Sequence, residues 1–192
     1  MLLDFVFDKT RISRRAAMST LAGGSAVLTS LMLPSTPARA QAAAWREYRD
    51  EEMGFRVEMP GGFKVRHDDG EAKDPWVKSI YAKINIDGMS MQATGIVYRG
   101  TPSVEEIYKL TQNCTGILGK LCATREERRV VSGMPAREYI READDDLNFI
   151  ARIVVVGNRA IAVGAFGERS SIHGNPAVLR FVDSLTLLQG RR

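Results

Sequence analysis

Four side chains that bind metal ions or move protons gather within residues 67–71. His67, Asp68, Asp69 and Glu71 provide one imidazole and three carboxylates, which are suitable ligands for calcium or a transition metal. The same composition is typical of a solvated polar turn, and the spacing matches no EF-hand loop. We therefore expect no metal site in this segment and no bound cofactor.

The acidic run Asp144–Asp146 raises the same question. Three adjacent carboxylates cannot all converge on one ion without a second ligand segment. The two histidines and two cysteines of the chain are too few for a multi-histidine or four-thiolate centre. A solvated turn is the simpler interpretation of this run.

Two further groups carry thioether, hydroxyl or imidazole chemistry. Met89 and Met91 could bind copper, but strand alternation places both on an apolar face, where core packing explains them. Ser170, Ser171 and His173 combine a nucleophile with a base, yet a hydrolase also needs an orienting acid and an oxyanion hole. The chain has no G-x-S-x-G motif, no P-loop and no dinucleotide-binding fingerprint. We assign no catalytic residue.

Cys114 and Cys122 are the two cysteines. On one continuous helix their Cα atoms would be about 12 Å apart, beyond the limit of about 7 Å for a disulfide. Gly116 or Gly119 could end the helix and let the chain fold back. In an oxidising compartment we therefore predict a disulfide between Cys114 and Cys122, and the alternative is two small buried apolar residues.

The first forty residues have the three parts of an export signal. A basic segment, Met1–Arg15, precedes the apolar stretch Ala16–Leu33, and Ala38-Arg39-Ala40 has the A-x-A form of a cleavage site. We predict cleavage after Ala40, with Ala42 as the alternative. A membrane anchor is the competing interpretation, but glycine, serine and threonine within the apolar stretch disfavour a spanning helix.

The export route depends on the residues just before the apolar stretch. Arg14 and Arg15 stand there, which is typical of the twin-arginine signal. Ala17 occupies the place where that signal usually has a bulky apolar residue, so the general secretory route is the alternative. Both routes place the mature chain, residues 41–192, in the periplasm.

Cleavage changes the charge of the protein. Residues 1–40 hold five of the 27 basic and two of the 23 acidic residues, so the mature chain has a net charge of +1. Its nearly balanced charge gives no indication of nucleic acid or an anionic membrane as a partner. We expect no stable membrane insertion after cleavage.

The mature chain, about 150 residues long, fits one domain. Asp87-Gly88 is a preferred two-residue turn between residues 80–86 and 89–95. That turn places Ile86, Ile84, Ala82 and Ile80 opposite apolar residues or glycine and leaves a polar opposite face, which fixes the register.

Other strands follow from alternation and turns. Phe55, Val57 and Met59 alternate with charged residues. Residues 147–156 and 159–166 predict a hairpin around Gly157-Asn158 that is apolar on both faces, as in central strands. Residues 127–132 and 136–142 predict strands around a turn at Gly133–Pro135.

Two helices are predicted from their caps. Ser103 and Glu106 form a capping box, followed by an apolar stripe that begins at Val104 and includes Ile107 and Tyr108. The second helix begins with Asn175 as N-cap and Pro176 at its first position. Strands followed by a helix, twice over, predict an α+β fold with helices packed on an antiparallel sheet.

Four segments resemble exported bacterial proteins of the PsbP-like superfamily: Trp45–Tyr48, Gly54–Pro60, Gly133–Tyr139 and Phe181–Leu185. The resemblance implies an α/β/α sandwich. It also implies a non-catalytic binding or accessory role, as in most members, and it supplies no catalytic residue.

The sequence therefore predicts a soluble periplasmic binding or accessory protein without catalytic activity, with an unknown protein or small ligand as partner. The alternative is a periplasmic enzyme acting on a small molecule or a cell-envelope substrate. A deep cleft with converging titratable groups favours the enzyme, and an exposed apolar patch favours a protein partner.

Overall fold

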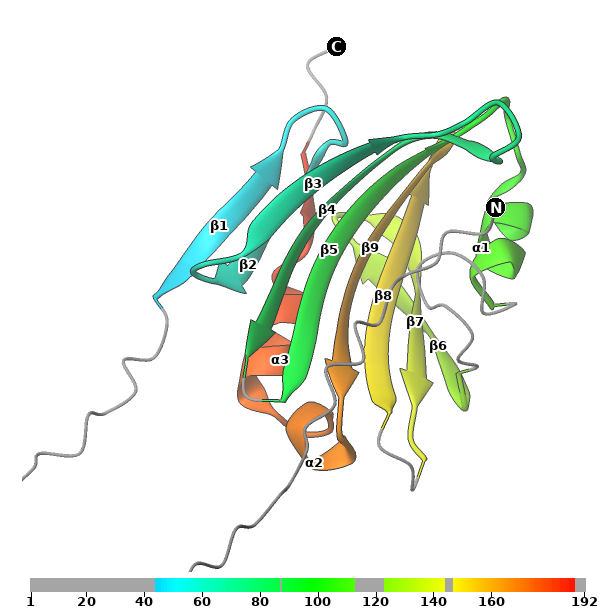
Figure 1. Cartoon of the computed structure of the whole chain (residues 1–192). Helices are drawn as coiled ribbons and strands as arrows, with labels where there is room; N and C mark the ends of the chain where they lie inside the picture. Colours follow the sequence, from blue (N-terminus) through cyan, green and yellow to red (C-terminus); the bar gives the residue numbers. More distant parts are fainter. Residues whose placement is uncertain (1–43, 87, 113–122, 144–146, 189–192) are drawn as a thin grey trace, which may run out of the picture. The chain divides into compact units, whose positions relative to one another are not determined.

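The computed structural model describes residues 44–86, 88–112, 123–143 and 147–188, which belong to one compact unit. Two antiparallel sheets dominate it (Figure 1). The small sheet has the order β1-β2-β10 and contains β1 (Trp45–Asp50), β2 (Phe55–Pro60) and β10 (Thr186–Leu187). The large sheet has the order β3-β4-β5-β9-β8-β7-β6, with strands β3 (Lys64–Asp69), β4 (Trp76–Ile86), β5 (Met89–Tyr98), β6 (Arg125–Val131), β7 (Met134–Arg141), β8 (Asn148–Val156) and β9 (Arg159–Gly167).

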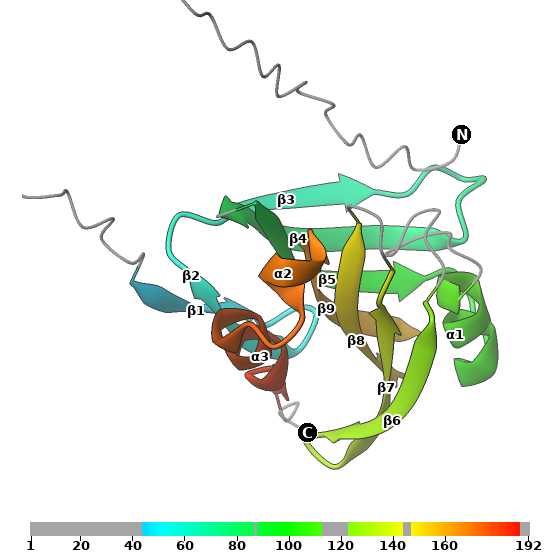
Figure 2. The same ribbon diagram turned by 90° about the horizontal axis from the view of Figure 1, so that it is seen from below.

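Helices lie on both faces of the large sheet. Helix α1 (Val104–Gln112) lies on one face, and α2 (Arg169–Ile172) and α3 (Pro176–Asp183) lie on the other, together with the small sheet (Figure 2). Each face has its own apolar core. The predicted helix-on-sheet arrangement is therefore confirmed only in part, because strands make up much of one outer layer of the sandwich. No helix among the described residues is long and apolar enough to cross a membrane.

The register of the first hairpin agrees with the prediction. Ile86, Ile84, Ala82 and Ile80 on β4 lie opposite Met89, Met91, Ala93 and Gly95 on β5, in that order. This face packs against the small sheet and α3. Gly88 has φ +76°, as the two-residue turn requires, and Asp87 lies outside the described residues.

The opposite face of this hairpin is less exposed than its polar composition predicts. Gln92 and Thr94 are buried, and the Gln92 Nε2 donates to the Thr94 Oγ1 at 2.9 Å. This hydrogen bond makes the burial tolerable, because it pairs a buried amide donor of Gln92 with a buried hydroxyl acceptor of Thr94.

The second hairpin is central, as its two apolar faces predict. Val156 lies opposite Arg159 across Gly157-Asn158, and β9 and β8 are the fourth and fifth strands of the large sheet. Phe149, Ala151, Ile153 and Val155 enter the α1-side core, while Val154 enters the other.

The turn between β6 and β7 starts one residue earlier and ends two residues earlier than predicted. It consists of Ser132 and Gly133, with φ +50° and +81°, the combination of a two-residue type I′ turn. Met134 and Pro135 belong to β7 instead. Pro135 is tolerated because the pairing of β7 with β8 begins only at Ala136, so no ladder donor is missing there.

The predicted capping box begins α1. The Glu106 carboxylate accepts from the Ser103 N–H at 2.7 Å, and the Ser103 hydroxyl accepts from the Glu106 N–H at 3.2 Å. Ile107 and Tyr108 are buried as predicted, but Val104 is 50% exposed. A residue in the first turn can point past the edge of the interface, which explains this error.

The cap makes the stability of the protein depend on pH. The hydrogen bond from the Ser103 backbone lowers the pKa of Glu106, so the ionised form stabilises the fold above the ordinary carboxyl pKa and this contribution disappears as the pH falls through the lowered value. We expect Glu106→Gln to lower the melting temperature at neutral pH and to match the parent at pH values below the lowered pKa of Glu106. Thermal melts across this range check it, and a constant difference at all pH values would contradict it.

The predicted N-cap of the second helix is also confirmed. The Asn175 side chain accepts from the Ala177 N–H at 2.9 Å, and Pro176 is the first residue of α3. Val178, Phe181 and Val182 are fully buried against the small sheet and the large sheet. Helix α3 thereby holds the two sheets together.

Candidate functional site

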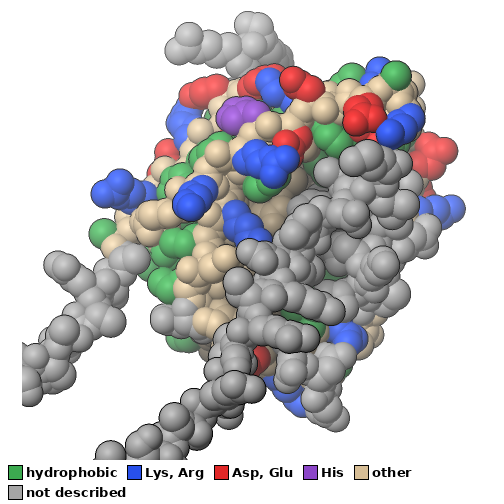
Figure 3. All heavy atoms as spheres, viewed as in Figure 1, with side chains coloured by type: hydrophobic (Ala, Val, Ile, Leu, Met, Phe, Trp, Pro, Cys, Tyr) green, Lys and Arg blue, Asp and Glu red, His purple; other side chains and the backbone are tan. Residues whose placement is uncertain are grey.

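The residues that suggested a metal site do not converge. His67, Asp68 and Asp69 lie on edge strand β3 and not in the expected loop, so successive side chains point to opposite faces. Asp68 accepts from Arg66 at 2.8 Å, and Glu71 pairs with a lysine. Acidic and basic side chains are intermixed on this face of the molecule (Figure 3). Within the described residues no group of three potential ligands is placed to hold a metal.

The other residues considered for metal binding or catalysis do not form a common site among the described residues either. Met89 and Met91 are buried in the core, as their position on the strand indicates. His173 follows α2, and its Nε2 lies 3.0 Å from the Arg141 carbonyl oxygen while its Nδ1 lies 3.3 Å from a Glu142 carboxylate oxygen. Both ring nitrogens therefore face β7 and the residue after it, which tethers α2 to the large sheet.

Four predicted segments lie outside the described residues. They are the cysteines Cys114 and Cys122, the arginines Arg14 and Arg15, the cleavage site at Ala40, and the acidic run Asp144–Asp146. The disulfide and the export signal therefore stay predictions.

A groove of about 1010 Å³ lies between the two sheets. It lies at the end of the sandwich where the β1–β2, β6–β7 and β8–β9 turns gather around β10 (Figures 1 and 2). We call it the inter-sheet groove. Its walls combine apolar and polar side chains: Met53, Met134, Val156, Ile161, Leu187 and Leu188, with Arg49, Glu51, Ser132, Arg159 and Thr186.

The β1–β2 turn forms one wall and is held by Asp50. The Asp50 carboxylate accepts from the Met53 N–H at 2.8 Å and from the Tyr48 hydroxyl at 3.0 Å. Burial and the neighbouring Asp50 raise the pKa of Tyr48, so this hydroxyl stays a donor at neutral pH. Gly54, with φ +78°, closes the turn in a conformation that disfavours a side chain.

Arg159 joins this wall to the large sheet. Its Nη1 donates to the carbonyl oxygens of Glu52 and Met53 at 3.2 and 3.4 Å. Lys78 on β4 adds a second link, because its ammonium group contacts the Glu52 carboxylate at 2.6 Å. The wall is therefore fixed relative to the sheet, and the groove is largely pre-formed.

Ser132 joins the two sheets at the opposite wall. The Ser132 hydroxyl accepts from the Leu187 N–H at 2.9 Å, while the next residue, Leu188, donates to the Gly54 carbonyl at 2.8 Å. The Leu187 N–H therefore points toward the β6–β7 turn, and the Leu188 N–H points toward the β1–β2 turn. Ser132 is the one non-glycine residue with positive φ in the described part of the chain, and its hydroxyl offsets the cost of that conformation.

This link predicts a graded response to substitution. Ser132→Ala keeps the left-handed strain and loses the hydrogen bond, so we expect the free energy of unfolding to fall by about 1 kcal/mol. Ser132→Gly loses the same bond but relieves the strain, so it should cost less. Urea unfolding of both variants checks the order, and a more stable alanine variant would contradict the role of the hydroxyl.

A second, smaller pocket of about 330 Å³ lies between α3 and strands β6 to β8. The buried Glu138 accepts from Arg129 at 2.8 Å and from Arg152 at 2.5 Å. Arg152 also donates to the Val182 carbonyl at 3.2 Å and to Asp183 at 2.8 Å. A cation near a helix C-terminus is favourable, so Arg152 attaches the end of α3 to the large sheet. The arginines and carboxylates of this network are paired with one another.

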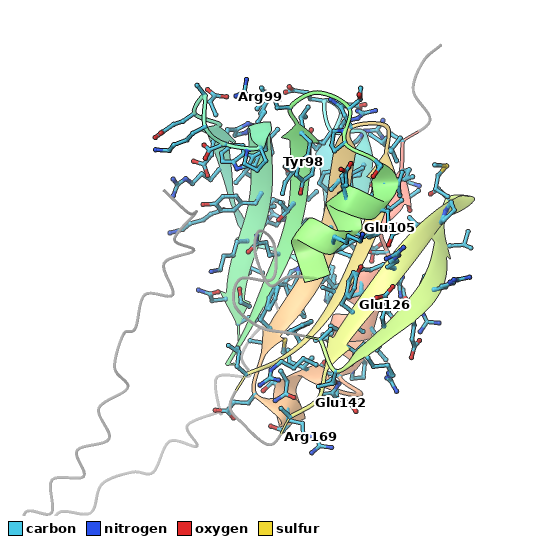
Figure 4. The ribbon with its side chains drawn as sticks, turned by 90° about the vertical axis from the view of Figure 1, so that its right-hand side faces the viewer. Tyr98, Arg99, Glu105, Glu126, Glu142 and Arg169 are labelled. Atoms are coloured by element: carbon cyan, nitrogen blue, oxygen red, sulfur yellow. The ribbon has the colours of Figure 1, made fainter. Side chains whose placement is uncertain are left out.

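The other face of the large sheet is closed by α1. Arg137 on β7 lies 4.0 Å from the centre of the Tyr108 ring and pairs with Glu105 at 2.6 Å and Glu126 at 3.4 Å. Figure 4 looks onto this face and labels Glu105 on α1 and Glu126 on β6. This cation–π contact and its carboxylates fix the helix on the sheet.

Beside this contact, the hydroxyl of Tyr139 is buried without a hydrogen-bond partner in the described structure. Burial, helped by Glu126, raises the pKa of Tyr139 to about 12. A raised pKa means that this tyrosine contributes stability below pH 10 that is lost as the pH rises toward 12.

We therefore expect Tyr139→Phe to be as stable as the parent, or more stable, at neutral pH, because no hydrogen bond is lost and an unsatisfied hydroxyl is removed. The variant should also resist alkaline unfolding better. Melting temperatures at pH 7 and between pH 10 and 12 measure both effects. A marked loss of stability at pH 7 would mean that the hydroxyl has a partner.

The inter-sheet groove was not predicted from the sequence. Its residues come from five strands and their turns, and they meet only through tertiary packing. One signal was present: Arg159 is a cation at the start of an otherwise apolar strand, directly after a tight turn. A long cationic side chain at the end of a buried strand suggests a polar contact with a neighbouring turn.

Comparison with known proteins identifies the fold. No family model matches the chain, and no curated protein matches its sequence. The solution structure of the cyanobacterial PsbP protein CyanoP, from Synechocystis sp. PCC 6803, is similar with a TM-score of 0.51 and 14% identity, covering 85% of this chain and 98% of that one. A crystal structure of a Pseudomonas aeruginosa protein of unknown function has 13% identity, covers 70% of this chain and 85% of that one, and reaches a TM-score of only 0.33. The predicted PsbP-like resemblance is thus confirmed for the fold.

Proposed function

We propose that the mature chain is a soluble periplasmic binding or accessory protein that acts through the inter-sheet groove and not through catalysis. The observation that carries the proposal is the groove itself. It is about 1010 Å³ in volume, close to the upper end of the usual range for ligand pockets. Its lining combines apolar side chains with a similar number of polar ones, and several of the polar groups are held in place by hydrogen bonds.

The fixed walls support binding in particular. Asp50 and Arg159 hold one wall through hydrogen bonds and Ser132 holds the opposite wall, so little conformational order has to be gained when a ligand enters. Pre-organisation of this kind raises affinity because the cost of ordering the site falls.

The enzyme alternative has no comparable support. A general base needs a reactive partner within hydrogen-bond reach. In the described part of the chain, both nitrogens of His173 already face oxygen atoms of Arg141 and Glu142. The arginines and carboxylates of the smaller pocket are engaged in one structural network.

Periplasmic location rests on the export signal of residues 1–40. The PsbP-like fold agrees with an accessory role, as the sequence resemblance implies. The partner is a protein segment or a small ligand of the periplasm.

Site-specific photo-crosslinking in the exporting cell tests this function. A photoreactive benzoylphenylalanine replaces Met134, a groove residue that is 38% exposed. The control replaces Val104, which is 50% exposed on α1, on the other face of the large sheet (Figure 2), and does not line the groove. We expect a discrete adduct from position 134 that is absent from position 104.

The adduct should also depend on the shape of the groove. Leu187→Trp, which would fill the groove from β10, should abolish it, while the folded state of the variant is verified by its melting temperature. No adduct from position 134, or equal adducts from positions 134 and 104, would count against a binding role for the groove.

A further inference from the structure

We infer that the inter-sheet groove binds a small amphipathic monocarboxylate, of the fatty-acid class, with its carboxylate on Arg159. The inference rests on the proposed binding function and adds the chemical class of the ligand. Three observations carry it: the charge balance of the groove, the placement of Arg159 and the apolar surface next to it.

The groove contains one cation that no carboxylate neutralises. Glu51 pairs with Arg49 at 2.6 Å, so these two charges cancel. Within the described part of the chain, the side chain of Arg159 donates hydrogen bonds to the carbonyl oxygens of Glu52 and Met53, and no ion pair joins it to a carboxylate there. The net charge of the lining is therefore +1, which one carboxylate would balance.

The guanidinium of Arg159 is held ready for such a group. Both hydrogen bonds to carbonyls come from Nη1, so the Nη2 and Nε donors are not used by them. A planar guanidinium with two remaining donors suits a carboxylate. Arg159 is only partly exposed, and partial burial strengthens the interaction of a charge pair.

The surface beyond Arg159 is apolar. Met53 and Ile161 are almost fully buried at the base of the groove, and Met134, Val156 and Leu187 continue along its walls. An alkyl chain would bury apolar area against the exposed Met134 and the partly exposed Val156 and Leu187, and burial of apolar area is favourable. Methionine side chains adapt to flexible alkyl chains.

A small molecule fits this site better than an extended peptide. A peptide strand needs free backbone donors and acceptors along a sheet edge, but the outward N–H of Leu187 on β10 is already bonded to Ser132. Strand β10 has only two residues, so it offers little edge for pairing. An alkyl carboxylate needs no backbone partner.

Binding of decanoate to the mature chain tests the inference by isothermal titration calorimetry and amide-resolved NMR. Decylamine and decan-1-ol, which have the same chain with a cationic or a neutral head, are the matched ligands. We expect saturable decanoate binding with shifts at groove residues, and binding at least about tenfold weaker for decylamine. This comparison needs no variant, so it stays decisive if a variant does not fold.

Two arginine variants then locate the carboxylate. Arg159→Gln should weaken decanoate binding by about tenfold or more, and Arg159→Lys should restore part of it. The control is Arg56→Gln, because Arg56 lies on β2 with a carboxylate partner of its own, Glu47, and does not line the groove.

The outcomes separate the inference from the proposed function. Equal binding of decanoate and decylamine in the groove, or unchanged binding by Arg159→Gln, overturns the carboxylate assignment while groove binding stands. No decanoate binding also overturns it. An absent crosslink from position 134 in cells counts against the function itself, even if decanoate binds in solution.

Discussion

Replacing Glu138 by glutamine will lower the free energy of unfolding by about 3 kcal/mol, the lower end of the range for breaking a buried ion pair. Glu138 is 2% exposed and accepts hydrogen bonds from Arg129 and from Arg152, which is 12% exposed. Removal of the carboxylate leaves the largely buried Arg152 charge with Asp183 as its one remaining carboxylate partner among the residues that the structure describes. Urea unfolding followed by circular dichroism measures the change.

Glu127→Gln is the matched control, because Glu127 also pairs with Arg129 but is 31% exposed. Partial exposure limits the value of such a pair, so we expect a loss below about 1 kcal/mol. The double variant Glu138→Leu/Arg152→Met should recover part of the stability lost by Glu138→Gln, since it removes both buried charges. Equal losses for the Glu138 and Glu127 variants would contradict the structural role of the network.

Gly95→Val will destabilise the protein by about 3 kcal/mol through overpacking. A Cβ atom added at Gly95 would lie 2.5 Å from the Cγ and 2.8 Å from the Cβ of Met53, closer than atoms can approach. Gly95 lies opposite Ile80 on β4 and Ile161 on β9, so β5 cannot move aside. Gly95→Ala should show a smaller loss in the same direction.

Met53→Ala provides the test of this mechanism. The shortened side chain removes the contacts with the Met53 Cγ and Sδ and keeps the one with its Cβ at 2.8 Å, so the loss from Gly95→Val should be smaller, but not abolished, in the Met53→Ala background. We expect a coupling energy of more than about 1 kcal/mol in the double-mutant cycle. Strictly additive effects would mean that Met53 is not the residue that requires glycine at this position.

The elements specified by local sequence were predictable. The first hairpin combines a two-residue turn with apolar alternation, and one register alone places all its apolar residues on one face. The capping residues Ser103 and Asn175 mark the two main helices because side-chain oxygens satisfy the free N–H groups at a helix start. In each case the physical cause lies within a few residues of the element.

The small sheet and the groove could not be predicted in this way. Strand β10 has two residues and pairs with β2 from the far end of the chain, so it has no periodicity of its own. Ser132 and Leu187 meet only because α3 brings the C-terminal segment back across the sandwich. The predicted turn at Gly133–Pro135 started one residue and ended two residues too late. Proline suggested a turn, but Pro135 is accommodated in β7 because the pairing of β7 with β8 starts after it.

Methyl-resolved NMR of the mature chain tests the central claim, that the groove is the binding site, most directly. The methyl groups of Ile161, Leu187 and Met134 report on the groove, and those of Ile107 and Ile96 report on the α1 side. The small-molecule fraction of periplasm and then decanoate are added to the labelled protein. We predict saturable shifts confined to the groove methyl groups in both titrations. Shifts confined to the α1 side, or no shift with either addition, would contradict the account.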